Sequence, residues 1–195
     1  MGEELEAALA GPPRMFVLDG DRYELTGSWT PLLRHLTAPS WHMPLLYDLL
    51  RTEDADALDD RLADDDDTLT LAQVETIAAR LVAAACGRKP WVAARLLGYA
   101  AQQWGEIDGA LTLRGVDLLA LVDTRPATAC NTIYAWLVDG GDEKARDKLN
   151  KELFKPPPGE DLDASPLWTA EEEGAAFLAA MSAKPGQRPR TARPS

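Results

Sequence analysis

Residues 88–137 read RKPWVAARLLGYAAQQWGEIDGALTLRGVDLLALVDTRPATACNTIYAWL. Tryptophan and aliphatic side chains recur in this stretch at helical spacing, and prolines and glycines divide it into segments. It holds almost no side chain that could act as a nucleophile or ligate a metal. This composition is typical of helices that bury themselves or a partner, so we expect a mainly α protein that works by binding.

Helix signals surround this stretch. Thr70 and Gln73 have the spacing of a capping box, which predicts a helix that runs through Cys86 and is ended by Gly87. Pro90 predicts the start of the next helix, because proline suits a first helical position. The apolar side that we predict for this second helix carries Trp91, Ala94, Leu97, Ala101 and Trp104.

The two helices over 71–86 and 90–104 are expected to frame the core. After a break at 114–117, a helix is predicted over 124–138, with an apolar face of Ile133, Trp136 and Leu137. Asp142 is the expected N-cap of a charged helix. Its apolar stripe is narrow and consists of Ala145, Leu149 and Leu153.

A β-hairpin is predicted over 15–25, because Asp19-Gly20 lies between two short runs of strand-forming residues. Two helices should follow. Thr30-Pro31 predicts the start of the first, and Ser40 is the expected cap of the second.

Residues 53–67 hold nine acids and one base, Arg61. We expect a marginal helix there, which ends in the loop 64–67 and has a thin apolar stripe of Ala57, Leu58 and Leu62.

These signals predict a multi-helix bundle with a small N-terminal β-hairpin. Residues 1–14 form an N-terminal segment and 15–155 the helical domain. Residues 156–182 combine a proline-rich, acidic linker with a short amphipathic helix, and 183–195 form a basic tail that we expect to be disordered.

The chain has 195 residues and a formal net charge of -12. Such a charge argues against nucleic-acid binding, which needs clustered lysine and arginine, and against attraction to anionic lipid. We find no signal peptide and no apolar run long enough to span a bilayer, so we expect a cytoplasmic protein.

Residues with chemical potential are few. His35 and His42 lack ligands at metal-binding spacing, so structural or surface roles are expected. Cys86 and Cys130 are expected to be buried thiols. The acids 64–67 lack the glycine of a calcium-binding loop, and no phosphate-binding motif is present. We therefore predict no catalytic, cofactor or metal site.

Apolar side chains that are not buried in the core could bind a partner. Trp91, Trp104 and Trp136 are expected in the core. The C-terminal amphipathic segment is too short to be stable alone, so we expect it to dock on this domain or on another protein. The predicted partner-binding residues are Trp168, Phe177, Leu178 and Met181.

Three segments carry a family resemblance. They read GRKPWVAARLLGYAAQQW, LRGVDLLAL and NTIYAWLVDGGDEKARDKLNKELFKPPPG, and they lie between Gly87 and Gly159. Their order resembles that in tail assembly chaperones of long-tailed phages and prophages of actinobacteria.

The resemblance implies a non-enzymatic, all-α chaperone. Proteins of this family bind the tape-measure protein in the host cytoplasm, keep it soluble during tail assembly and are absent from the mature virion. The family also implies a longer, frameshifted form of the same protein as a partner. The major tail protein and a second copy of this chain are further candidate partners.

Two other functions compete with this expectation. An acidic helical module could inhibit or regulate a basic partner, as a DNA mimic or an antitoxin-like protein does. That function requires carboxylates spaced along one face, whereas here they concentrate in 53–67 and 160–173. An enzyme ranks third, because neither histidine has a visible catalytic partner.

Overall fold

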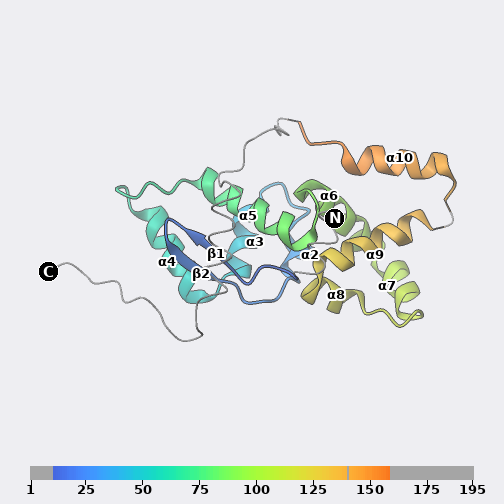
Figure 1. Ribbon diagram of the computed structural model, residues 1–195, viewed down its shortest axis with the longest axis horizontal. Coiled ribbons are helices and arrows are strands. Elements are labelled where there is room, and N and C mark those ends of the chain that lie inside the picture. Colours follow the sequence, from blue (N-terminus) through green and yellow to red (C-terminus); the bar gives the residue numbers. More distant parts are fainter. Residues whose placement is uncertain (1–10, 140, 159–195) are drawn as a thin grey trace. The chain divides into compact units, whose positions relative to one another are not determined.

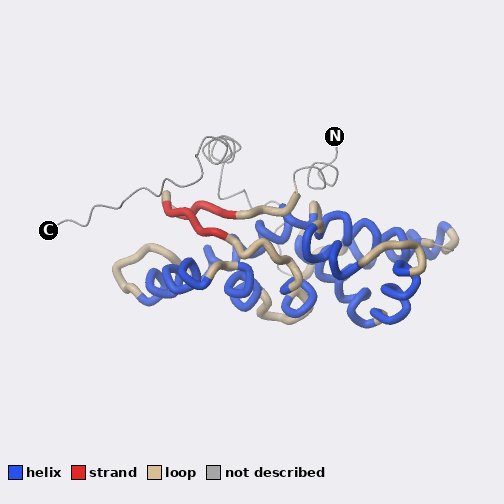
Figure 2. Tube along the Cα trace, turned by 90° about the horizontal axis from the view of Figure 1, so that it is seen from below, coloured by secondary structure: helices blue, strands red, loops and turns tan. Residues whose placement is uncertain are grey.

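The computed structural model describes residues 11–139 and 141–158. Within them, nine helices follow a two-stranded antiparallel hairpin, so the fold is mainly α with a small N-terminal hairpin, as the sequence predicts. Figure 2 shows the strands in red along the outside of the helices. The predicted tail 183–195 and the predicted C-terminal amphipathic helix lie outside the described residues.

The hairpin consists of β1 (Met15–Leu18) and β2 (Asp21–Glu24). Asp19 and Gly20 both have positive φ, 52° and 91°, as the predicted tight turn requires. Phe16 pairs with Tyr23 across the strands, and their rings stack with centroids 5.0 Å apart. This face of the hairpin is buried against the helices.

Three short helices come next: α2 (Pro31–His35), α3 (His42–Leu49) and α4 (Thr52–Ala63). The prediction that Ser40 caps the second helix is wrong, because the helix begins one residue later, with Trp41 at the N-cap position and no side-chain cap. In α4, Leu58 is buried as expected, but Ala57 is exposed. The helix ends at Ala63, where the acidic loop was predicted to begin.

Helix α5 (Leu71–Cys86) has both predicted end signals. The backbone N–H of Gln73 donates to Oγ1 of Thr70 (3.3 Å), and the N–H of Thr70 donates to Oε1 of Gln73 (2.8 Å). At the other end Gly87 is left-handed, with φ 61°. These local signals fix the helix at both ends.

Helix α6 (Pro90–Gln102) begins at Pro90 as predicted, but of its predicted apolar side only Leu97 is buried. Ala101 is exposed, Trp91 and Ala94 are partly covered, and Trp104 belongs to the following helix. The residues that pack inside are Val92, Ala93, Leu96, Leu97, Gly98 and Ala100. The alanines on both sides hid the orientation, which is set by the neighbouring helices α2 and α5.

The last helices are α7 (Trp104–Thr112), α8 (Leu118–Thr124), α9 (Pro126–Val138) and α10 (Glu143–Phe154). The predicted break at 114–117 is confirmed, and Asp117 caps α8 by accepting from the N–H of Ala120 (2.9 Å). α7 and α8 were not predicted as separate helices, and α9 begins two residues after the predicted start.

Helices α5 and α6 lie at the centre of the packing, as expected. α5 contacts α3, α6 and α9, while α6 also contacts α2, α7, α9 and α10. Among the tryptophans of the described residues, Trp29, which precedes α2, is fully buried, whereas the expected core residues Trp91, Trp104 and Trp136 are only partly covered. α10 (orange) packs on α6 away from the hairpin (blue) in Figure 1.

Candidate partner-binding surface

The four predicted partner-binding residues, Trp168, Phe177, Leu178 and Met181, lie outside the described residues. Within the described residues, the large apolar side chains that face solvent indicate where a partner could bind. Four are exposed: Leu71, Leu113, Leu119 and Phe154. A leucine exposed to water gains nothing from folding, so exposed leucines that lie close together in the chain suggest a binding surface.

Two of these leucines flank the turn at 114–117. Leu113, which follows α7, is 91% exposed, and Leu119 in the first turn of α8 is 49% exposed. We call this pair the turn leucines. Gly115 has φ 77° and so lets the chain reverse between the two helices. Sequence reasoning identified this turn as part of the family resemblance but did not single out its leucines.

A second feature is the attachment of α10. Nη1 of Arg95 in α6 lies 2.6 Å from the carbonyl oxygen of Glu152 and 2.8 Å from that of Leu153, and it also bonds to that of Lys155. The last carbonyls of a helix lack donors within the helix, so this guanidinium supplies them from outside. Sequence reasoning missed this contact, which joins residues far apart in the chain.

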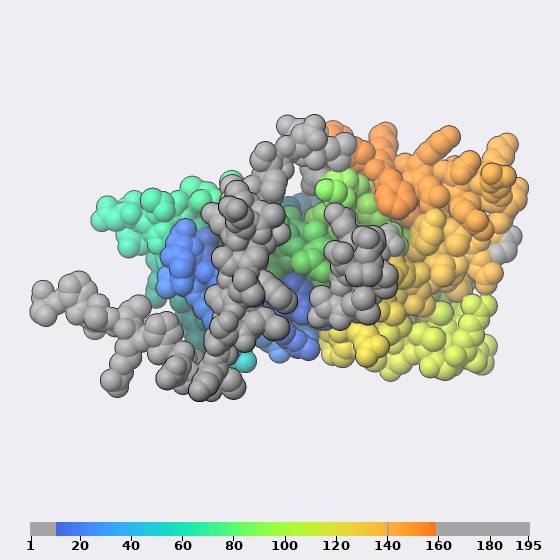
Figure 3. Space-filling view, in the orientation of Figure 1, coloured from blue at the N-terminus to red at the C-terminus, as the bar shows by residue number. Residues whose placement is uncertain are grey.

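Helix α9 makes a second polar contact with α10. The hydroxyl of Tyr134 donates to Oδ1 of Asn150 (2.8 Å), and the guanidinium of Arg88 lies over the Tyr134 ring at 5.6 Å. Leu153 is buried in the core. Figure 3 shows that α10 (orange) forms part of the outer surface.

The histidines have structural contacts. Nε2 of His35 lies 2.7 Å from Oδ2 of Asp48, and Arg34 donates to the same oxygen (3.0 Å), so both side chains join α2 to α3. The ring of His42 stacks on Trp41, with centroids 3.8 Å apart. Across residues 11–139 and 141–158, no group of three His, Cys, Asp or Glu side chains is placed to hold a metal ion.

The cysteines are buried thiols, as predicted. Cys86 ends α5 and Cys130 lies in α9, and the two thiols are hydrogen-bonded to each other. This bond and burial raise the pKa of the Cys86 thiol well above its usual value. Because the thiolate is the reactive form, Cys86 is a poor nucleophile at neutral pH.

Some acids of α4 and the following loop form hydrogen bonds within the chain, and the others face solvent. Asp54 accepts from the backbone N–H of Glu24 (2.9 Å), and Asp59 accepts from the Tyr47 hydroxyl. Burial, together with Asp59, raises the pKa of Tyr47 to about 12. Most other acids in this region face solvent. They therefore form a negative surface whose members are only partly used to hold the fold together.

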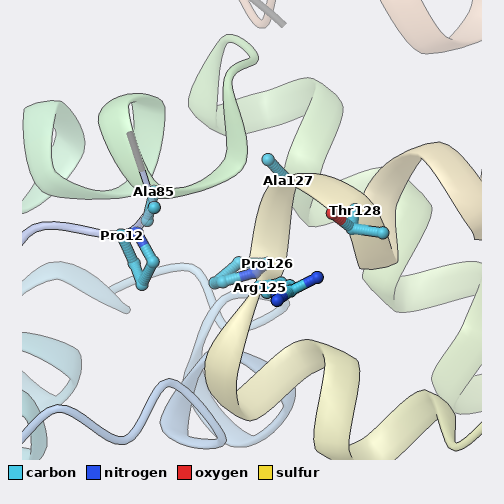
Figure 4. A pocket seen from close by; sticks show the side chains of 7 residues that line it. Pro12, Ala85, Arg125, Pro126, Ala127 and Thr128 are labelled. Carbon is cyan, nitrogen blue, oxygen red and sulfur yellow. The ribbon is translucent and has the colours of Figure 1, made fainter. Parts of the chain in front are cut away.

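A small hollow lies between the start of α9 and the end of α5. Figure 4 shows Arg125, its charged lining residue, with the guanidinium directed away from Pro12 and Ala85. Small-molecule sites usually carry several converging polar groups, whereas small apolar residues form most of the lining here. The hollow is therefore a poor candidate for a ligand site.

In the described part of the chain, no helix combines the length and apolar character needed to cross a membrane. No protein-family model matches the sequence, and neither the curated proteins nor the solved structures contain a match.

Proposed function

We propose that this protein is a tail assembly chaperone of a long-tailed phage or prophage of actinobacteria. In this function it binds the tape-measure protein in the host cytoplasm, without catalysis, and keeps it soluble until the tail is assembled. The observation that carries the proposal is the turn at 114–117. It lies in the LRGVDLLAL segment of the family resemblance, and it presents two leucines to solvent.

The physical properties support a holding role. A tape-measure chain is long, helical and apolar, so it aggregates unless its apolar stripes are covered. Amphipathic helices of this kind are recognised by apolar surfaces on helical proteins. The turn leucines offer such a surface, and the net charge of -12 favours a soluble complex.

Co-expression with a tape-measure protein tests the proposal. The soluble fraction of the tape measure should rise when the wild-type chain is present, and the two proteins should copurify. Replacing Leu113 and Leu119 by Ser should reduce this effect. Replacing Phe177 and Met181 by Ser tests the predicted C-terminal residues in the same way.

Leu71→Ser is the matched control, because Leu71 is also about half exposed but lies at the start of α5. It should leave the soluble fraction unchanged. If the wild-type chain neither copurifies with the tape measure nor changes its solubility, the proposal is wrong.

A second candidate function is an acidic module that masks a basic partner. The exposed acids of α4 and the loop 64–66 favour it. We rank it lower because Asp54, Asp59 and Asp67 are engaged in contacts within the chain. Binding to a basic nuclease or repressor that weakens steeply with salt would support this alternative.

A further inference from the structure

The two cysteines of the chain lie against each other in the core. They are 44 positions apart in the sequence, and no third cysteine competes for either of them. Cys86 is the last residue of α5 and Cys130 lies in α9. The hydrogen bond between their thiols brings the two sulfurs together. Two thiols from distant parts of a chain that meet in this way are placed to form a disulfide.

Small side chains stand beside both cysteines. Ala85 precedes Cys86 and Ala129 precedes Cys130, and both alanines are buried. Helices α5 and α9 are in direct contact, and small side chains at a contact allow two helix backbones to approach closely. A disulfide needs such an approach, because its geometry tolerates only a narrow range of Cα separations.

A polar contact next to the thiols holds the two helices in register. Nη2 of Arg88, two residues after Cys86, donates to Oδ1 of Asn131, which follows Cys130 (2.7 Å). Gly87 is left-handed and ends α5 directly after Cys86. The end of α5 is therefore fixed against α9, while Cys86 can shift slightly without bending a longer helix.

We propose that Cys86 and Cys130 are a redox-sensitive pair, which closes to a disulfide between α5 and α9 in oxidising surroundings and reopens in reducing ones. In the structure both are free thiols, which is the reduced state of the pair. Disulfides of cytosolic proteins, where they occur, are usually transient and redox-sensing. The proposal does not depend on the proposed function.

A small disulfide such as oxidised glutathione is the oxidant. The thiolate of one cysteine attacks a sulfur of glutathione disulfide, which forms a mixed disulfide and releases one glutathione. The thiolate of the other cysteine then attacks the protein sulfur of the mixed disulfide and releases the second glutathione. The two cysteine thiols thus lose two electrons and two protons, and these convert one glutathione disulfide to two glutathione thiols. Because both cysteines are buried, the exchange starts during folding or in a transient opening.

The disulfide encloses a large part of the bundle. Residues 87–129 lie between the two cysteines and contain α6, α7, α8 and the turn leucines. A cross-link over a loop of this length restricts the unfolded chain, so it stabilises the folded state when the fold accommodates the bond. The oxidised protein should therefore resist separation of α9 from α5.

The test uses the full-length protein, unfolded in urea and then diluted into mixtures of reduced and oxidised glutathione, with or without urea. Mass spectrometry after acid quenching and alkylation measures the disulfide that joins the tryptic peptides 81–88 and 115–144. The equilibrium constant for its formation should be on the order of 100-fold larger in the native protein than in urea. The Tm of the oxidised protein should accordingly exceed that of the reduced protein by about 5 °C or more.

Cys86→Ala and Cys130→Ala are the matched controls, because each keeps one thiol and cannot form the bond. Oxidised glutathione should not raise the Tm of either variant, and dithiothreitol should return the oxidised wild type to its reduced Tm. The proposal is overturned if the equilibrium constant is no larger in the native protein than in urea, or if only mixed disulfides with glutathione form. It is also overturned if the oxidised wild type is no more stable than the reduced one, since the fold would then not accommodate the bond.

Discussion

Arg61 and Asp67 form a two-point ion pair at the end of α4. Nε of Arg61 lies 2.7 Å from Oδ2 of Asp67, and Nη2 lies 3.0 Å from Oδ1. The same Nη2 also donates to Asp19 at the tip of the hairpin (2.6 Å). One arginine thus joins the acidic loop to the hairpin turn, two parts of the sequence that would otherwise repel each other.

This pair predicts a dependence of stability on acid pH. Hydrogen bonds from Arg61 and from the N–H of Leu69 lower the pKa of Asp67 from 3.8 to about 2. Because the pKa is lower in the folded state, the pair stabilises the fold above pH 3.8, and this stabilisation is lost as the pH falls towards about 2. Urea unfolding should show a steeper loss of stability in this range for the wild type than for Asp67→Asn.

Asp65→Asn is the matched control for this prediction. It removes the same charge from the same loop, at an exposed position. Its stability should fall with pH as in the wild type. If the wild type and Asp67→Asn lose the same amount of stability between pH 4 and 2, the Arg61–Asp67 pair is not the cause of the pH dependence.

The capping box of α5 predicts a difference between two identical substitutions. Thr70→Ala removes the oxygen that accepts from Gln73, and it should lower the free energy of unfolding by about 1 kcal/mol. Thr76→Ala lies within the helix, where alanine is the better helix former, so it should be neutral or stabilise by up to about 0.7 kcal/mol. Equal effects in urea unfolding would show that the cap does not stabilise α5.

Signals carried by neighbouring residues could be predicted from the sequence. The Asp19-Gly20 turn, the Thr70 cap and the Asp142 cap each depend on side chains within a few residues of each other. Such contacts do not depend on how the rest of the chain packs. The existence of the hairpin and of most long helices follows from them.

The orientation of the helices could not be predicted in the same way. The buried face of α6 depends on which helices surround it, and alanines on both sides left the sequence pattern ambiguous. Helix α8 spans only seven residues, too few for a clear period. Ala145 faces solvent although it is in register with Leu149 and Leu153, because only the end of α10 is covered.

The attachment of α10 to α6 shows the same limit. Arg95 and Leu153 are 58 positions apart, and nothing in the local sequence of either residue indicates the other. The role of Arg95 depends on the docking of α10, which is a tertiary event. In contrast, the exposed leucines lie beside a turn that the sequence did indicate through Gly115.

Leu58 should be the main apolar anchor of α4, since it is the buried residue of that helix. Leu58→Ala should lower the free energy of unfolding by about 2–5 kcal/mol, through lost burial and the cavity left behind. Leu62→Ala, at a partly covered position in the same helix, should cost less. Urea unfolding measures both, and an equal or larger cost for Leu62 would show that α4 packs through a different face.

The thiols of Cys86 and Cys130 should be protected by burial in the folded protein. They are 1% and 0% exposed, and the raised pKa of Cys86 leaves little thiolate to react. Labelling with a thiol-specific disulfide reagent should therefore be at least about 10³-fold slower in the native protein than in urea, since reaction must wait for rare unfolding. Cys130→Ala removes the hydrogen-bonding partner but not the surrounding helices, so Cys86 should remain slow to react in this variant. Immediate reaction of one thiol in the native protein would mean that the contact between α5 and α9 opens without global unfolding.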